Sequence, residues 1–278
     1  MADTNKPAEL QLASEPLAEN GHQHTRTATN GELTALLHAN SSGVLLGLLK
    51  NPQIGEREIL TLLGRKELPC DVVEAISKRR DWLKIYAIKK SLACHPHVPR
   101  LVGLRLLREL YLMDLVQIAR TPAVSAELKR NSEDQLAARL PQLPLGQKIT
   151  LARRGPARIA GLLLAEGHPQ VMVVTLDNPR LTSGQILKAL AKEGLPESVA
   201  QAIAQHRRWS IEYNVRLALV RNPATTLSTV LNYLPQLKVS DLQDLVAPGI
   251  VPERLRKYLE AETRRRVHAE KRSTSGNI

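Results

Sequence analysis

Phenylalanine is absent from this 278-residue chain, and aromatic side chains make up only 3% of it. Sandwiches and barrels of β-strands draw heavily on aromatic and β-branched residues, so this scarcity argues against an all-β fold. Leucine takes their place, at 47 residues. A core of Leu, Ala, Ile and Val favours helices packed on helices, and we predict an all-α fold.

Cysteine is also scarce. Cys70 and Cys94 are the two cysteines of the chain, and neither belongs to a C-x-x-C pair, so structural zinc and iron–sulfur frameworks are not indicated. The stretch from Cys94 to His97 holds three potential metal ligands, but no second cluster completes a site. We therefore predict no metal and no cofactor.

Long apolar runs are missing. The longest runs, residues 43–49 and 159–165, are far shorter than the roughly 20 residues that a membrane-spanning helix needs. Residues 1–20 contain no apolar segment of the kind found in secretory signals. These patterns predict a cytoplasmic protein without a membrane span and with reduced thiols.

Catalytic signatures are missing as well. The sequence contains neither of the glycine-rich phosphate-binding motifs, G-x-x-x-x-G-K-[ST] and G-x-G-x-x-G. It also contains no G-x-S-x-G and no H-E-x-x-H, and its eight histidines are spread along the chain. We therefore expect a protein that is not an enzyme, and no small-molecule substrate is evident.

Charge of one sign is abundant. Lys and Arg number 39 against 27 acidic residues, which gives a net charge of +12 and an isoelectric point near 10.0. Such a field favours polyanionic partners, although it also fits a protein whose charges serve only solubility. Charge alone does not choose between these two interpretations.

The most informative feature is an internal duplication at an offset of 127 residues. Without any gap, 21 of 71 positions are identical between the segment starting at Leu49 and the segment starting at Leu176. The matched residues include Trp82 with Trp209, Tyr86 with Tyr213, and Asp114 with Asp241. A repeat of this kind predicts an architecture of stacked, similar units.

Each copy has a finer period of 44 residues, marked by a polar residue followed by proline. Such dipeptides begin at Asn51, His95, Asn178 and Asn222, and a fifth begins at His168. Proline lacks an amide N–H and pushes the preceding residue out of the helical region, so a helix ends there. We predict that these dipeptides form corners between short helices.

Apolar residues between the corners recur at steps of three and four, as helices require. The β-branched run 171–174 could form a short strand, but its place in the repeat favours a buried helix. We predict a disordered tail over residues 1–30 and a helical repeat domain over 31–250. Its related halves span about 46–119 and 173–246, and a basic helix and tail follow over 251–278.

Short helices in units of about 40 residues resemble the HEAT and armadillo repeats. The run from Asn214 to Thr225, NVRLALVRNPAT, is also similar to units of the leucine-rich-repeat-variant family. The resemblance covers roughly residues 31–250 and implies a right-handed α-solenoid. The iron–sulfur cluster associated with the variant family is not carried over, because the chain has no cysteine cluster.

Solenoids of this kind mostly bind proteins through a concave surface, and a minority bind nucleic acid. One HEAT-like class consists of alkylpurine DNA glycosylases, which would need a carboxylate in a basic, aromatic-lined cleft. Asp81 beside Trp82 is the nearest candidate, but the second copy has Arg208 in place of Asp81.

Two cations stand out within apolar stripes. We predict that a helix after Asp81 places Trp82, Tyr86 and Lys89 on one face, and Trp209, Tyr213 and Arg216 repeat the pattern. The aromatics can serve as core or as stacking anchors. The cations can pair with acids of a neighbouring helix, Lys89 with Asp114 and Arg216 with Asp241, or they can line a groove that receives an anionic partner.

The sequence thus predicts a non-catalytic scaffold or adaptor that binds another macromolecule, most readily a protein, through a curved helical surface. The alternatives are a nucleic-acid-binding protein that uses a basic face and, more remotely, a DNA-repair glycosylase. The candidate partner-binding residues are Arg80, Arg207, Lys89, Arg216, Arg153 and Arg154.

Overall fold

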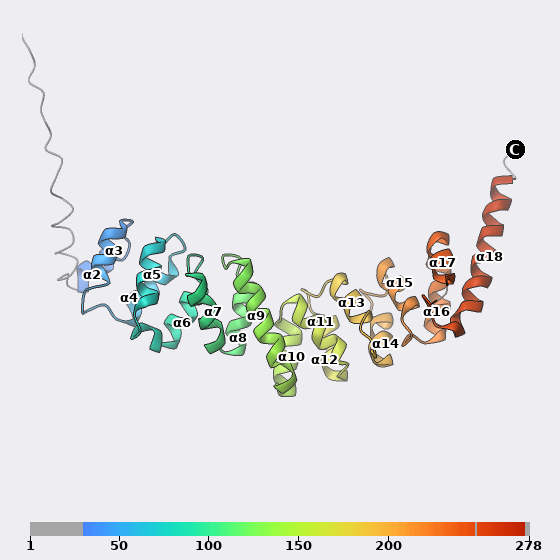
Figure 1. Ribbon diagram of the computed structural model, residues 1–278, viewed down its shortest axis with the longest axis horizontal. Coiled ribbons are helices and arrows are strands. Elements are labelled where there is room, and N and C mark those ends of the chain that lie inside the picture. Colours follow the sequence, from blue (N-terminus) through green and yellow to red (C-terminus); the bar gives the residue numbers. More distant parts are fainter. Residues whose placement is uncertain (1–29, 248, 276–278) are drawn as a thin grey trace, which may run out of the picture. The chain divides into compact units, whose positions relative to one another are not determined.

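A computed structural model describes residues 30–247 and 249–275, and over this part of the chain it is entirely helical (Figure 1). It contains seventeen α-helices, α2 to α18, and three short 3-10 helices, η1 to η3, with no strand among the described residues. The all-α prediction is therefore confirmed. The predicted disordered tail falls almost wholly outside the described residues, since α2 begins at Asn30.

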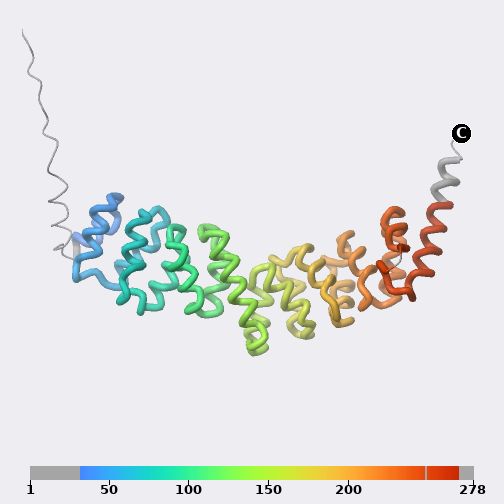
Figure 2. The backbone as a smooth tube through the Cα atoms, in the orientation of Figure 1, coloured from blue at the N-terminus to red at the C-terminus, as the bar shows by residue number. Residues whose placement is uncertain are grey.

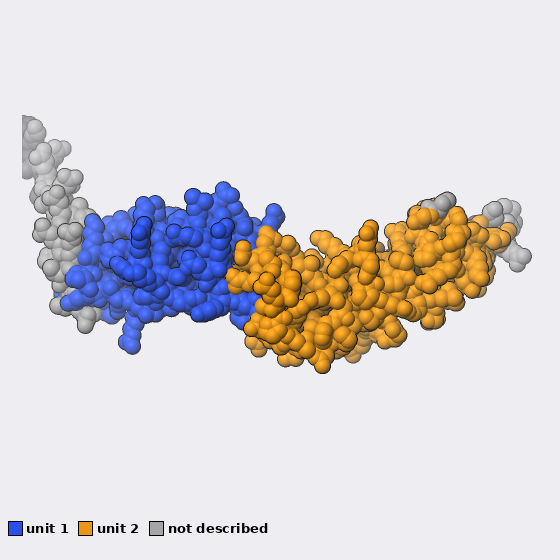
Figure 3. All heavy atoms as spheres, turned by 60° about the horizontal axis from the view of Figure 1, so that its bottom comes forward, with its two compact units in different colours: residues 1–114, 121–131 blue, residues 115–120, 132–278 orange. Residues whose placement is uncertain are grey.

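The chain divides into two compact units (Figure 3). Unit 1 comprises residues 1–114 and 121–131, and unit 2 comprises 115–120 and 132–278. The second copy of the duplication lies wholly in unit 2, whereas the first lies in unit 1 apart from residues 115–119.

Unit 1 is built from helices of similar length. Two further helices, α8 (Leu112–Arg120) and α9 (Ala126–Arg139), contribute residues to both units. The elements of unit 1 are α2 (Asn30–Leu36), α3 (Ser42–Leu48), α4 (Glu56–Gly64), α5 (Cys70–Lys78), η1 (Trp82–Lys84), α6 (Tyr86–Ala93) and α7 (Arg100–Glu109).

Unit 2 continues the same pattern and ends in one long helix. Its elements are η2 (Leu140–Gln142), α10 (Leu145–Arg154), α11 (Ala157–Glu166), α12 (Pro169–Leu176), α13 (Ser183–Leu190), α14 (Glu197–Gln205), α15 (Tyr213–Arg221), α16 (Leu227–Tyr233), η3 (Leu234–Gln236), α17 (Val239–Val246) and α18 (Glu253–Ser275). The run 171–174 lies in α12 and is helical, as its place in the repeat predicted.

Helices that are two apart in the chain pack side by side in each unit. In unit 2, α10 packs on α12 and α12 on α14, while α11 packs on α13 and α13 on α15 (Figure 2). In unit 1 the same alternation joins α3 with α5 and α4 with α6. Each unit therefore contains two rows of helices. The leucine-rich core of unit 2 includes Leu164, Ile186, Leu190, Ile203 and Leu219.

The Asn-Pro corners bind one helix to the helix before it in the same row. Asn178 follows α12 and is 1% exposed. Its side-chain N–H donates to the carbonyl of Ala152 at 2.7 Å, and its side-chain oxygen accepts from the backbone N–H of Arg180 at 2.8 Å. Asn222 follows α15 and donates to Leu190 in the same way. The last carbonyls of a helix lack partners inside that helix, so these contacts satisfy them.

In unit 1, His95 stands in for asparagine at the corresponding corner. One ring nitrogen of His95 bonds the carbonyl of Arg65 at 2.9 Å, and the other accepts from the N–H of His97 at 3.1 Å. Burial lowers the pKa of His95, which favours the neutral ring that this corner needs. The prediction that these dipeptides punctuate helices is confirmed.

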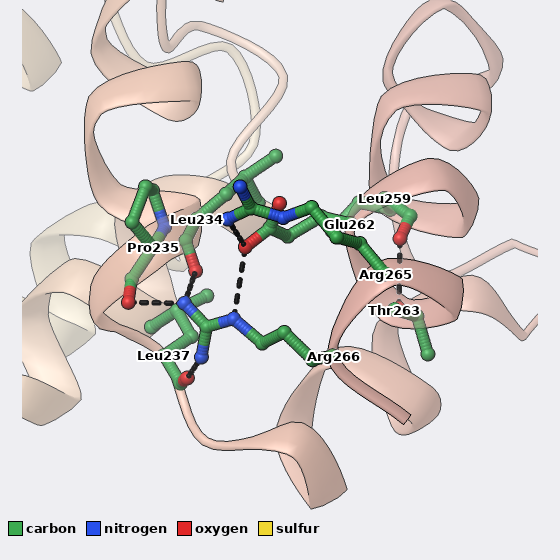
Figure 4. Close-up of polar contacts among 8 residues, drawn as sticks. All are labelled: Leu234, Pro235, Leu237, Leu259, Glu262, Thr263, Arg265 and Arg266. Atoms are coloured by element: carbon green, nitrogen blue, oxygen red, sulfur yellow. Dashed lines mark hydrogen bonds and ion pairs between the residues drawn. The ribbon is translucent and has the colours of Figure 1, made fainter. Parts of the chain in front are cut away.

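The C-terminal helix α18 packs on α17 and is bonded to η3, the short helix that follows α16. The guanidinium of Arg266 donates to the carbonyl of Leu237 at 2.7 Å, to that of Leu234 at 3.2 Å and to that of Pro235 (Figure 4). Glu262 holds the same guanidinium through Nε at 2.8 Å. Arg266 thus caps η3 as the asparagines cap other helices, and it anchors α18 to the rest of unit 2.

Candidate partner-binding groove

Neither tryptophan belongs to a helix with the following tyrosine, and the predicted shared face is wrong. Ile85, between Trp82 and Tyr86, has extended backbone angles of φ −81° and ψ 118°, so η1 ends before α6 begins. Trp209 lies in the turn before α15, and Glu212 is extended in the same way. The spacing of the apolar residues matches a helix, but the chain bends at Ile85 in the first copy and at Glu212 in the second.

Both tryptophans are core residues. Trp209 is fully buried and its indole N–H donates to the carbonyl of Leu176 at 3.0 Å, while Trp82 is 8% exposed. Arg208 and Arg79 cover these rings from outside, at 4.1 Å and 4.4 Å from the ring centroids. Of the two roles that the sequence left open, the structure supports the core and leaves neither ring free to stack on a ligand.

The expected ion pairs of the cations with the two aspartates are also not formed. Tyr86 and Tyr213, not the predicted cations, donate to Asp114 and Asp241, and each tyrosine oxygen accepts a backbone N–H at 2.9 Å. Burial and the aspartate raise the pKa of Tyr86 to about 12, which keeps its hydroxyl protonated as the donor. The tyrosine–aspartate pair is thus the contact that repeats at the offset of 127 residues.

The cations find other partners. Lys89 forms an ion pair with Glu109 at 2.5 Å, and its neighbour Lys90 pairs with Asp114 at 2.8 Å. Arg216 donates its Nε to the carbonyl of Ser210 at 2.6 Å and lies 6.0 Å from the ring centroid of Tyr233. Arg216 is half-buried, and no acidic side chain among the described residues forms an ion pair with it.

Arg216 lines a polar groove of about 560 Å³ between α14 and α16. Amide and hydroxyl side chains surround it, and Arg216 is the one charged residue among the described residues of the lining. Ile211, 67% exposed, adds an apolar edge. The lining comprises Gln201, Ala204, Gln205, Ser210, Ile211, Arg216, Thr226, Ser228, Thr229, Asn232, Tyr233 and Gln236.

Spacing on the helices places the four amides along this groove. Gln201 and Gln205 lie one turn apart on α14, and Asn232 and Gln236 lie one turn apart on α16 and η3. Sequence reasoning missed these residues because uncharged amides carry no catalytic or metal-binding signal. The signal that would have found them is comparison with the first copy, where the four matching positions are all charged.

A second groove, of about 810 Å³, is apolar and lies between α13 and α15. Leu187, Leu190, Leu195, Leu217 and Ala218 form its walls. Its lining also includes Lys192, Glu193 and Arg221, all of which are exposed. Unit 2 thus has an open groove along each of its two rows of helices.

Of the six candidate partner-binding residues that the sequence suggested, one, Arg216, lines the polar groove. Arg80 and Lys89 belong to unit 1, and Lys89 is engaged with Glu109. In unit 2, Arg216 lines the polar groove, whereas Arg207 in the turn after α14 is exposed outside its lining. Arg153 and Arg154 are exposed at the end of α10 and also lie outside the lining.

The remaining sequence candidates, near His97, Cys94 and Asp81, lie outside both grooves. His97 bonds the carbonyl of Leu68 at 2.8 Å, and burial raises the pKa of the Cys94 thiol. Among the described residues, no group of three or more metal-ligating side chains gathers at one point. Asp81 is exposed and pairs with Lys84, so it does not form an aromatic-lined cleft with the buried Trp82.

Within residues 30–247 and 249–275, no helix is both long and apolar enough to cross a bilayer.

No protein-family model, curated protein or solved structure matches this chain.

Proposed function

We propose that the chain is a non-catalytic binding scaffold, built as a right-handed α-solenoid of HEAT or armadillo character. Three features support this architecture: the two rows of short helices, the corners that tie a helix to the one before it in its row, and the capping of η3 by α18. Stacked repeats bury their core only between neighbours and leave one long surface for binding.

The observation that carries the proposal is the pair of open grooves between neighbouring helices of unit 2. A groove with four amides, five hydroxyl groups and one cation offers hydrogen bonds without the charge repulsion that a highly charged surface would impose on most partners. Beside it, Ile211 supplies exposed apolar area for a partner to bury. We infer that another protein is the partner.

Substitution of Ile211 by glutamate tests this function. The variant places a charge at the edge of the polar groove, on a side chain that is already 67% exposed, and so should not affect folding. Full-length wild-type protein and variant serve as baits in quantitative affinity capture from the native cell extract. We expect at least one protein to be retained by the wild type and to lose about tenfold in recovery with Ile211→Glu, because a buried charge opposes docking.

Val173→Glu is the matched control, because Val173 is 64% exposed in the same unit and lies outside the groove lining. It should retain the partner. Equal recovery with Ile211→Glu and the wild type for every captured protein would refute binding through this groove.

Nucleic-acid binding is the second candidate function. The observation that favours it is a set of four exposed arginines, Arg80, Arg153, Arg154 and Arg207, none of which forms an ion pair with another described residue. Such residues can contact phosphates and release counterions. The buried tryptophans argue against stacking on unpaired bases, which leaves backbone contacts as the mode of binding.

A further inference from the structure

Arg216 is a half-buried cation with no acidic partner, and this arrangement needs an explanation. A buried charge without a counter-charge costs free energy, so proteins usually pair it. Arg216 satisfies only its Nε, on the carbonyl of Ser210. Glu212, the N-cap residue of α15 and four residues before Arg216, forms no ion pair with it. Among the described residues, the two terminal guanidinium nitrogens have no hydrogen-bond partner.

The first copy of the repeat shows what unit 2 lacks. Lys89 corresponds to Arg216 at the offset of 127 residues, and its partner Glu109 corresponds to Gln236. Where unit 1 neutralises its cation with a carboxylate, unit 2 therefore has an amide that carries no charge. Gln236 donates its amide to the carbonyl of Asn232 at 2.9 Å and does not bond Arg216.

The same replacement extends along the whole groove. Glu74 and Lys78, which form an ion pair at 2.7 Å in unit 1, correspond to Gln201 and Gln205, and Arg105 corresponds to Asn232. Four charged positions of the first copy are thus uncharged amides in the second. Only the cation at the position of Arg216 is retained, which leaves one uncompensated positive charge in an otherwise uncharged groove.

We propose that this groove binds an extended segment of a partner protein, with one carboxylate of that segment on Arg216. The inference rests on the proposed scaffold function and names the chemistry that its unit 2 groove recognises. A guanidinium presents paired N–H donors that match the two oxygens of a carboxylate, and one arginine balances one such charge.

The amides suit a peptide main chain. Each offers both an N–H donor and a carbonyl acceptor, as does each peptide unit of an extended segment. The side chains of Gln201, Gln205 and Asn232 make no hydrogen bond to other described residues, so these donors and acceptors are available. Main-chain contacts of this type supply affinity, and the carboxylate on Arg216 supplies selectivity and register.

Nucleic acid is a poorer occupant of this groove. Phosphate backbones are recognised by several cations along the strand, whereas the groove holds one. The ring of Tyr233 could stack on a base only if it were accessible, but it is 8% exposed and its hydroxyl is bonded to the carbonyl of Ala204. A single carboxylate therefore fits the charge of the site better than a polyphosphate strand.

Gln236→Glu tests the proposal because it restores the acid that unit 1 has at this position. The probe is an array of octapeptides in which each position in turn is fixed as Asp, Asn, Lys or phosphoserine, with uncharged residues elsewhere. For the full-length wild-type chain, we expect peptides with Asp at one position to bind about tenfold more tightly than their Asn counterparts. Gln236→Glu should remove that preference, and Arg216→Gln should do the same.

Lys89→Gln in unit 1 is the matched control and should leave the preference intact, because Lys89 is already paired with Glu109. Thermal unfolding of each variant establishes that its helices are intact. Gln236 is exposed, so its substitution should not change the midpoint. An unaltered Asp preference in Gln236→Glu would overturn the proposal.

The remaining outcomes separate this inference from the scaffold function. Peptide binding without any Asp preference, or a preference for phosphoserine, overturns the carboxylate site while the scaffold function stands. If no peptide binds and the capture experiment also yields no groove-dependent partner, both fall together.

Discussion

Replacing Trp209 by alanine should lower the free energy of unfolding by about 3–5 kcal/mol, the largest effect that we expect from a single substitution in this chain. Trp209 is the largest fully buried side chain, and it lies in the core of unit 2 with its indole N–H on the carbonyl of Leu176, the last residue of α12. Alanine leaves a cavity and also leaves the carbonyl of Leu176 without its indole donor.

Urea denaturation followed by circular dichroism at 222 nm measures the loss. Trp209→Phe separates the two contributions, because it keeps most of the ring volume and removes the hydrogen bond, and it should cost about 1–3 kcal/mol. A loss below about 0.5 kcal/mol for the alanine variant would show that Trp209 is not the core residue that the structure describes.

Asn178→Ala should cost about 2–4 kcal/mol, the second largest effect. The side chain is 1% exposed and bonds the carbonyls of Ala152 and Gly155 and the N–H of Arg180, all of which lose their partner in the variant. The loss arises at the corner that joins α12 to α10, so it tests the tie between neighbouring helices of one row.

Asn214→Ala is the control, because Asn214 is exposed on α15 and its side chain makes no hydrogen bond to other described residues. It should change stability by less than about 0.5 kcal/mol. Urea denaturation of both variants under the same conditions compares them. Equal stability of Asn178→Ala and Asn214→Ala would mean that the corner asparagine does not tie α12 to α10 within their row.

Local signals predicted the helices and their ends well. Proline forces the backbone out of the helix within one or two residues, so the corners at Asn178 and Asn222 can be recognised without knowing any tertiary contact. The place of residues 171–174 in the repeat likewise predicted their helical state, against the strand preference of their β-branched side chains. Both signals can be read from the sequence without any tertiary contact.

Contacts between helices were harder to predict. Tyr86 and Asp114 lie 28 residues apart, and which side chain of α6 meets Asp114 depends on how two helices rotate against each other. The sequence therefore indicated an ion pair with Lys89, one turn away from the residue that makes the contact. Ile85 also ended a stretch that its apolar spacing had suggested was one helix.

The candidate groove could not be found from residue type alone. Arg216 was noticed because a cation in an apolar stripe is unusual, but its surroundings are uncharged amides with no motif of their own. Only the pairing of Lys89 with Glu109 in unit 1 shows that an acid is missing at Gln236. The duplication thus contains the information, once the structure identifies which positions face each other.

Fluorescence anisotropy of labelled duplex DNA and RNA, titrated with the full-length chain from about 50 to 300 mM salt, tests most directly whether the partner is a protein or a nucleic acid. Our account predicts at most weak binding at the lowest salt, from the net charge of +12, and none near 150 mM. Micromolar or tighter binding near 150 mM that falls steeply with salt, and that Arg80→Glu and Arg207→Glu weaken, would contradict it and make the exposed arginines the functional surface.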